Sequence, residues 1–195
     1  MSATLDTEPA IGSVTAELSF ISPDGTSPVY YASKAGDRDG ALRLAEYTRQ
    51  AVEIHNARAR RPPFTLDRNG YELIDHASAV SDFFAEEQRK EVWEPEVEAL
   101  IKAHTGAARV FVFDHTLRAD SPELRETKQV REPASVVHND YTDKSAPTRL
   151  RAFLPDEAEA LMARRFAIVQ VWRPLDRPVE SAPLAVCDAQ STDAA

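Results

Sequence analysis

Two side chains that could bind a metal ion stand two positions apart in the sequence, His138 and Asp140. They lie within residues 136–142, a run rich in β-branched and aromatic residues that predicts a β-strand. Because side chains at positions i and i+2 of a strand point to the same face, the imidazole and the carboxylate would project side by side. Such a pair supplies two of the three ligands in the 2-His-1-carboxylate triad of non-haem Fe(II) oxygenases.

The third ligand of such a triad, a histidine from a later strand, is absent from the sequence, because none of the five histidines follows His138. Three ligands would leave open corners on the metal for a bidentate 2-oxo acid and dioxygen. The His-x-Asp spacing also arises by chance in many proteins. A histidine hydrogen-bonded to a nearby acid is therefore the alternative interpretation. The five histidines are His55, His76, His104, His115 and His138.

The composition is that of a soluble globular protein of one domain. The chain has 195 residues, 43% hydrophobic and 28% charged, which is enough to form a core of ordinary size. Its net charge of −9 argues against binding to nucleic acid or to anionic membranes. The sequence has a single cysteine, no apolar run near the ~20 residues of a membrane helix, and no signal-peptide pattern at its N-terminus. These features predict a cytoplasmic protein.

The elements that must position the pair are mostly strands. Asn69-Gly70, between residues 64–67 and 71–74, is a strong signal for a two-residue hairpin turn. The nearly all-apolar run at 166–172 suits a central strand that is covered on both faces. Further strands are predicted by alternation or by β-branched and aromatic residues. The predicted strands are residues 14–21, 51–56, 109–113, 136–142, 166–172 and 184–187.

Helices are expected chiefly in the centre of the chain. Good helix formers predict a helix over residues 83–92, and Pro95 and Gly106 have the positions expected at the start and end of a second one. A third helix should begin at residues 155–157, where proline precedes two acids. A short helix is also predicted at 41–49, and a polar mobile loop at 117–133.

Longer motifs across the chain resemble those of a known family, in the family's order. They occupy residues 52–58, 61–70, 112–118, 137–142, 165–175 and 178–188, and the run RFAIVQVWRPL at 165–175 is the closest match. The sequence thereby resembles the CmcJ-like oxidoreductases, a group that includes the cephamycin methoxylation protein and fungal hydroxylase/desaturase-like enzymes of secondary metabolism. The resemblance extends from about residue 14 to residue 188.

The resemblance implies an α+β, mainly β fold: a double-stranded β-helix, or jelly roll, with flanking helices. It also implies Fe(II) and 2-oxoglutarate as cofactors, with His138 and Asp140 matching the family's first two metal ligands. The family's third histidine lies in a downstream His-Thr-Ala-Phe motif followed by an arginine-rich segment, and this sequence has neither. Gln190 stands where relatives usually carry an arginine, which removes a cation that could bind a carboxylate.

These departures predict a jelly roll that lacks its last strands. We expect residues 1–12 to be disordered, residues 13–190 to form a single incomplete oxidoreductase domain, and residues 191–195 to be a disordered tail. Because unpaired strand edges invite pairing with other chains, self-association or a complementing chain is an expected partner, besides a small-molecule substrate.

Other residues have a functional and a structural interpretation. By the family's motifs His115 and Tyr141 could line the substrate pocket, although a backbone-bonded histidine and a core tyrosine are the alternatives. Arg173 could bind the anionic cosubstrate, or it could form an ion pair with Glu180. Residues 149–151 carry two arginines that would share one face of a strand, with a solvated edge as the alternative.

The leading functional interpretation is an oxidoreductase that hydroxylates or desaturates a small metabolite with Fe(II) and 2-oxoglutarate. The alternatives are a catalytically inactive remnant or binding module, and one half of a split enzyme that another chain completes. The missing histidine favours the alternatives for this polypeptide, whereas the motifs favour the enzyme for its lineage.

Overall fold

The computed structural model describes residues 12–22, 29–30, 43–44, 46–59, 63–175 and 177–192. Strand β1 (Ser13–Ile21) pairs antiparallel with β4 (Tyr47–His55) along its whole length, from Ser13 opposite His55 to Ile21 opposite Tyr47. The strands predicted at 14–21 and 51–56 are therefore confirmed. The predicted disordered segments lie outside the described residues except at their inner ends.

A second antiparallel pair joins β2 (Val29–Tyr30) to β3 (Arg43–Leu44). The helix predicted at residues 41–49 is therefore wrong, since its described residues belong to β3 and to the start of β4. The alternation of side chains in β4 and its long ladder with β1 outweigh the weak local preference for helix.

The hairpin predicted at Asn69-Gly70 is also wrong. Following the 3-10 helix η1 (Ala57–Ala59), helix α1 (Leu66–Asn69) is capped by Thr65 Oγ1, which accepts from the Arg68 N–H at 3.4 Å. Gly70 follows in the left-handed conformation with φ of 78°. A glycine with positive φ serves both a hairpin turn and a helix C-terminus, so the dipeptide alone does not distinguish them.

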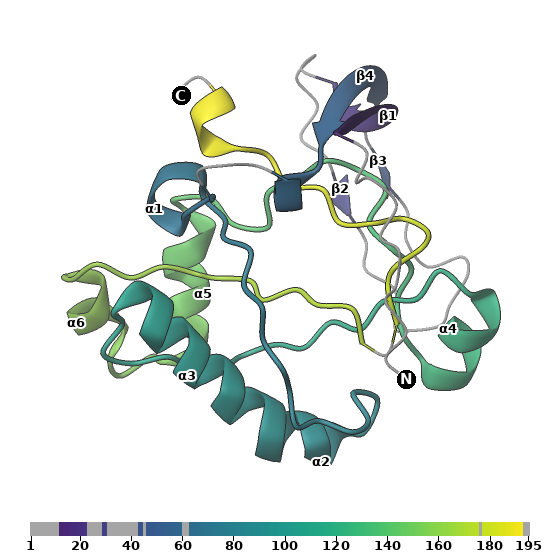
Figure 1. Cartoon of the computed structure of the whole chain (residues 1–195). Coiled ribbons are helices and arrows are strands. Elements are labelled where there is room, and N and C mark those ends of the chain that lie inside the picture. Colours follow the sequence, from purple (N-terminus) through teal and green to yellow (C-terminus); the bar gives the residue numbers. More distant parts are fainter. Residues whose placement is uncertain are drawn as a thin grey trace.

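One long helical run forms the side of the molecule opposite β1 and β4 (Figure 1). It consists of α2 (Glu86–Gln88), the π-helical turn η2 (Arg89–Trp93) and α3 (Glu94–Thr105), and Gly106 ends it with φ of 69°. The predicted helices around 83–92 and 95–104 are thus confirmed, but as a continuous run. Pro95 has no N–H to donate to the preceding turn, and the π turn lies directly before it.

The core lies along this helical run. Phe83, Trp93, Val97 and Ile101 are buried together, and the Phe83 and Trp93 rings meet edge-on at 5.4 Å. Partly buried side chains from later segments pack against them, so that the helical run and the extended segments share one core. These side chains are Val80, Val110, Val112, Val171 and Leu175.

Three shorter helices complete the chain. Helix α4 (Pro122–Lys128), capped by Ser121, replaces the mobile loop predicted at 117–133. The Ser-Pro-Glu start is a normal helix N-terminus. Helix α5 (Ser145–Phe153) contains the two arginines that were assigned to a strand face, so that prediction is wrong. Helix α6 (Ala158–Met162) confirms the third predicted helix, starting just after residues 155–157, and the 3-10 turn η3 (Ala189–Ser191) lies near the end.

The strands predicted at 109–113, 136–142, 166–172 and 184–187 are not formed within the described part of the chain. These segments are extended, and those from residue 165 onward cross the middle of the view in Figure 1 without a ladder. Strands exist through hydrogen bonds to a neighbour. Among the residues described here, isolated bridges join only Ser19 with Val136 and Arg118 with Arg131. Helices consequently include more of the described residues than strands do, so the prediction of a mainly β chain is wrong here, and the α+β description holds.

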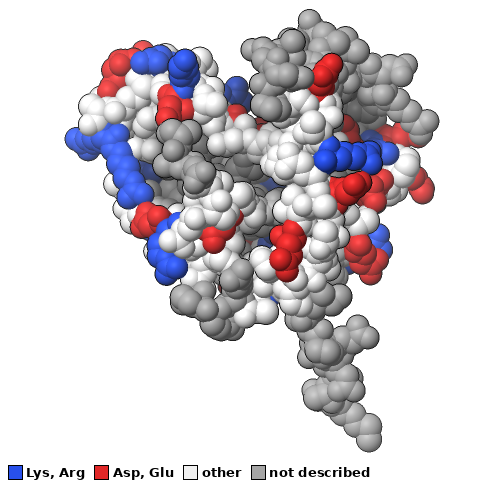
Figure 2. All heavy atoms as spheres, turned by 90° about the horizontal axis from the view of Figure 1, so that it is seen from above, with Lys and Arg blue, Asp and Glu red and all other residues white. Residues whose placement is uncertain are grey.

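The surface carries mixed charges. Acidic and basic side chains are interspersed on the face shown in Figure 2, with no large area of one sign. Each helix in the described part of the chain is too short or too polar to cross a bilayer.

Candidate functional site: a half-complete metal centre

His138 and Asp140 lie side by side although their segment forms no strand. His138 Nε2 is 3.1 Å from Asp140 Oδ1, and the two side chains are 42% and 45% exposed. The segment is attached to the sheet just before the pair, because the Val137 N–H donates to the Ser19 carbonyl of β1 at 2.8 Å. The predicted juxtaposition is therefore present, and its open side faces solvent.

A backbone hydrogen bond sets the tautomer of the histidine. His138 Nδ1 is 2.7 Å from the Val136 carbonyl oxygen. Because a carbonyl oxygen only accepts, Nδ1 must carry the proton, which in a neutral imidazole leaves the lone pair on Nε2. Metal-binding histidines are commonly oriented in this way, with the distal nitrogen free for the metal. The free nitrogen here is the one that faces Asp140.

The geometry of the pair fits two neighbouring ligands of one metal ion. A lone pair on Nε2 and a carboxylate oxygen at 3.1 Å repel each other unless a proton or a cation lies between them. Two ligand atoms at right angles, each about 2.1 Å from a divalent transition metal, are about 3 Å apart. The observed separation agrees with that value, and it equally fits the alternative of a hydrogen bond from a protonated His138 to Asp140.

The second oxygen of Asp140 is held by a residue that sequence analysis did not identify. Gln170 Nε2 donates a hydrogen bond to Asp140 Oδ2, so that Oδ1 is left to face His138. Gln170 lies in the middle of the apolar run at 166–172, and a polar residue at such a position is the one signal that could have indicated a role.

A third ligand is not found among the described residues, which contain no group of three or more His, Cys, Asp or Glu side chains placed to hold a metal. Each of the other histidines lies instead beside a glutamate. The pairs are His55 with Glu53, His76 with Glu96, His104 with Glu72, and His115 with Glu94.

Tyr141 joins an aromatic cluster next to the metal-ligand pair. Its ring meets Phe113 edge-on at 6.3 Å, and the Phe113 ring lies 5.1 Å from that of Phe153 on α5, tilted by 36°. The guanidinium of Arg149 covers Phe153 at 4.5 Å and Phe113 at 5.6 Å. Tyr141 is thus placed where it can form an apolar wall beside Asp140.

His115 lies apart from that wall. Its Nε2 is 3.0 Å from Glu94 Oε1 of α3, and the residue lines a cavity of about 250 Å³. Tyr141, His138 and Asp140 do not line this cavity. The structure therefore does not bring the two predicted pocket residues, His115 and Tyr141, into one pocket.

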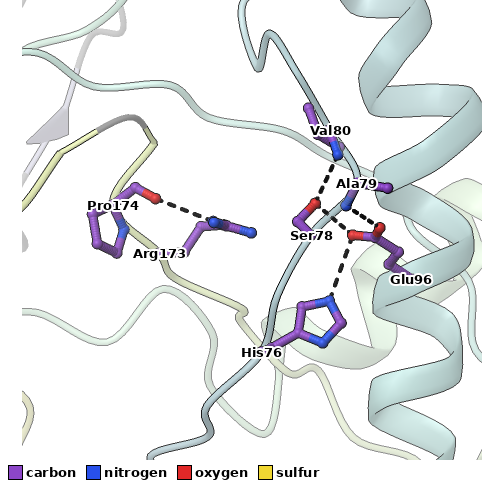
Figure 3. A network of polar contacts seen from close by, with 7 residues as sticks. All are labelled: His76, Ser78, Ala79, Val80, Glu96, Arg173 and Pro174. Carbon is purple, nitrogen blue, oxygen red and sulfur yellow. Dashed lines mark hydrogen bonds and ion pairs between the residues drawn. The ribbon is translucent and has the colours of Figure 1, made fainter. Parts of the chain in front are cut away.

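Arg173 packs against the core instead of reaching the metal-ligand pair. Its guanidinium lies 4.7 Å from the Phe83 ring and 5.3 Å from the Trp93 ring, and Nε donates to the Pro174 carbonyl at 3.1 Å. In Figure 3 the side chain points toward the segment that contains His76 and Ser78. The expected ion pair with Glu180 is not found within the described residues.

The carboxylate of Glu96 on α3 binds that same segment from its other side (Figure 3). It accepts hydrogen bonds from Ser78 Oγ at 2.6 Å and from the Ala79 N–H at 2.8 Å, and His76 Nε2 is 3.5 Å away. The hydrogen bond from Ser78, followed by that from Ala79, lowers the pKa of Glu96. This network stabilises the fold around α3.

Gln190 belongs to a polar cluster at α1. Its Oε1 accepts from Asn69 Nδ2 at 3.3 Å and from Arg68 Nη2 at 3.4 Å, and Asn69 Nδ2 also donates to Asp188 Oδ1 at 2.9 Å. A cation is therefore present beside position 190, but Arg68 provides it. An arginine at 190 would bring two guanidinium groups together.

The sequence belongs to a recognised oxidoreductase family. The profile of the Oxidoreductase/YMDC permease-like domain (YDMC) matches residues 18–195, and the chain is a member of this family. An oxidoreductase of Emericella nidulans is 33% identical over 183 residues, which are 86% of this chain and 62% of that protein. Hydroxylase/desaturase CTB9 of Cercospora beticola is 33% identical over 181 residues, which are 86% of this chain and 54% of that protein. The resemblance expected from the motifs is confirmed.

A relative with a solved structure extends the comparison. The Fe(II)/2-oxoglutarate-dependent dioxygenase nvfI of Aspergillus novofumigatus is 30% identical over 191 residues, covering 90% of this chain and 64% of that protein. The structure of the iron and alpha-ketoglutarate-dependent endoperoxidase NvfI superposes with a TM-score of 0.64 at 22% identity, covering 78% of this chain and 56% of that one. The two share a fold, and the chain spans less than two thirds of each of these relatives.

Proposed function

We propose that this chain carries part of the catalytic domain of an Fe(II)/2-oxoglutarate-dependent oxygenase that hydroxylates or desaturates a small metabolite. One observation carries the proposal: His138 Nε2 and Asp140 Oδ1 converge at 3.1 Å with the histidine tautomer set for metal binding. The similarity to proteins named as hydroxylase/desaturase and as dioxygenase supports this chemistry over that of a binding module.

Each residue of the site has a role in this proposal. His138 and Asp140 would hold Fe(II), which with 2-oxoglutarate and dioxygen supplies the oxidising power of the reaction. The Val136 carbonyl orients the imidazole, and Gln170 orients the carboxylate. Tyr141 and the aromatic side chains behind it would exclude water from one side of the substrate. The single cysteine suits the reducing environment of the cytoplasm.

The proposal needs a third ligand from outside the described residues, and we infer that it arrives with added β-strands of a jelly roll. The extended segments at 166–172 and 184–187 have no ladder partner among the described residues, and they expose apolar side chains such as Trp172 and Leu184. Such edges can pair with further strands. Those strands could follow in a longer polypeptide or belong to another chain.

Metal titration tests the proposal directly. Co(II), a probe that resists oxidation, is titrated into the whole chain, and its affinity is measured by calorimetry and by its visible absorption. His138→Ala should weaken binding by about tenfold or more, because it removes one of only two ligands. His104→Ala is the matched control, since His104 pairs with Glu72 away from the site. Equal affinities in the two variants would refute the site.

A further inference from the structure

The cavity that contains His115 has neither His138 nor Asp140 in its lining, and three basic side chains line it. It lies between the start of the π turn η2, the segment at 114–117 and the C-terminal end of α4. Arg89, Lys128 and Arg131 line it together with one carboxylate, Asp114. Three cations against one anion leave an excess of positive charge in a volume of about 250 Å³.

Each of the three cationic residues contacts a different part of the chain. Arg89 Nη1 donates to the Phe83 carbonyl at 2.7 Å, and Lys128 Nζ lies 5.2 Å from the centre of the Phe84 ring. The backbone of Arg131 is fixed by two hydrogen bonds to the segment opposite. Its N–H donates to the Leu117 carbonyl at 3.1 Å, and its carbonyl accepts from the Ala119 N–H at 2.8 Å.

The cations of the cavity form no close ion pair in the described part of the chain. No ion pair there includes Arg89, Lys128 or Arg131. Glu94 of α3 is engaged by His115, whose Nε2 is 3.0 Å from Glu94 Oε1. Three cations that share one carboxylate, Asp114, still repel one another, so an arrangement of this kind favours a further anion between them.

Arg89 also has a side-chain donor that is not satisfied among the described residues. Its Nε is buried, and it finds no hydrogen-bond acceptor in the described structure. A buried donor without a partner costs about 1–3 kcal/mol, and in native proteins it commonly marks a missing water or ion. Arg89 is also the first residue of the π turn, a rare feature that is frequent at functional sites.

The geometry points to a binding site for a small anionic molecule, recognised through a carboxylate or phosphate group by Arg89, Lys128 and Arg131. The planar guanidinium groups suit bidentate contact with either group, and the lysine adds a point charge. A volume of about 250 Å³ suits a small metabolite. This site is independent of the metal ligands and of the function proposed for them.

Calorimetric titration of the whole chain with inorganic phosphate and with citrate tests the site, at an ionic strength held constant with sodium chloride. We expect saturable binding at a single site, and the tighter of the two probes identifies phosphate or carboxylate as the recognised group. If neither probe binds in a saturable manner, the inference is overturned.

Substitutions on α4 and just after it distinguish a specific anion site from non-specific attraction of anions to the surface. Lys128→Gln and Arg131→Gln change exposed side chains, so the fold should persist, and each should weaken binding by about tenfold through loss of one charge-assisted contact. Arg125→Gln, also on α4 but outside the cavity lining, removes the same charge and should change affinity less than about twofold. An equal loss in all three variants would overturn the site.

Arg89→Lys keeps the charge and removes the planar group. We expect it to bind the preferred probe about tenfold more weakly, because a lysine cannot make the bidentate contact. Thermal unfolding of this variant, measured in parallel, shows whether the chain is folded. Co(II) binding at His138 and Asp140 should be unchanged in all of these variants, so a failure here and a failure of the metal site give different results.

Discussion

The helical run from α2 to α3 and the extended segments at 165–188 differ in how completely their backbone is hydrogen-bonded and their apolar side chains are buried. The helical run has a glycine C-cap, a buried ring pair and a carboxylate network on its surface. The extended segments hold the residue that orients Asp140, yet they form no ladder within the described residues and expose several apolar side chains. Stability therefore resides mainly in one region, and the chemistry that we propose for His138 and Asp140 depends on the other.

The two tryptophans of the chain give the sharpest measure of this difference. Trp93 is 8% exposed in the core, whereas Trp172 is 50% exposed on an extended segment. Trp93→Ala should lower the free energy of unfolding by about 3–5 kcal/mol, because it leaves a cavity in the core. Trp172→Ala should lower it by less than about 1 kcal/mol. Urea unfolding followed by circular dichroism measures both, and similar losses would show that the extended segment is packed as fully as the core.

Much of the helical region could be predicted because its signals are local. Pro95 and Gly106 indicated the bounds of α3, and the alternation of β4 indicated a strand. The hairpin prediction at Asn69-Gly70 was wrong because a glycine with positive φ occurs both in hairpin turns and at the ends of helices. The predictions of strands at 166–172 and 184–187 were wrong for another reason, since a strand needs a hydrogen-bonded neighbour, which local sequence does not specify.

The candidate site also has one part that the sequence predicted and one part that it did not. The i, i+2 spacing of His138 and Asp140 could be read from the sequence, and the side chains do converge. The contact from Gln170 crosses 30 positions of the sequence, and the stacking of Arg173 on Phe83 and Trp93 crosses more. Contacts between distant segments depend on the tertiary arrangement, which local patterns do not encode.

Two asparagines extend the comparison to buried polar groups. Asn69 is 2% exposed, and its side chain accepts from the Thr65 N–H at 3.1 Å and donates to Asp188 and Gln190. Asn69→Ala should therefore cost about 2–3 kcal/mol of unfolding free energy, because it leaves buried partners unsatisfied. Asn139→Ala, at an exposed position next to the metal-ligand pair, should cost less than about 0.5 kcal/mol. Thermal unfolding that ranks them in the opposite order would contradict the assigned role of α1.

Gln170 tests whether the extended region serves the metal site. Gln170→Ala should weaken Co(II) binding about tenfold, because Asp140 loses the hydrogen bond that orients it, while the free energy of unfolding changes by less than about 0.5 kcal/mol. Gln88→Ala is the control in the helical region, where the side chain accepts from Ser81. A metal affinity that is lowered equally by both changes would rule out a positioning role for Gln170.

Ser78 gives the smallest expected effect and a pH dependence of defined sign. Because its hydrogen bond is the main cause of the lowered pKa of Glu96, the folded state gains stability above the ordinary value of 4.5 and loses that gain as the pH falls through the lowered pKa. Ser78→Ala should cost about 1 kcal/mol at pH 7, and the difference from the unsubstituted chain should shrink below pH 4.5. Ser81→Ala, whose hydroxyl donates to the uncharged side chain of Gln88, should show a smaller cost that does not change over this range. Chemical unfolding at a series of pH values measures both, and a Ser78→Ala deficit that stays constant into acid would show that Glu96 does not stabilise the helical region through its charge.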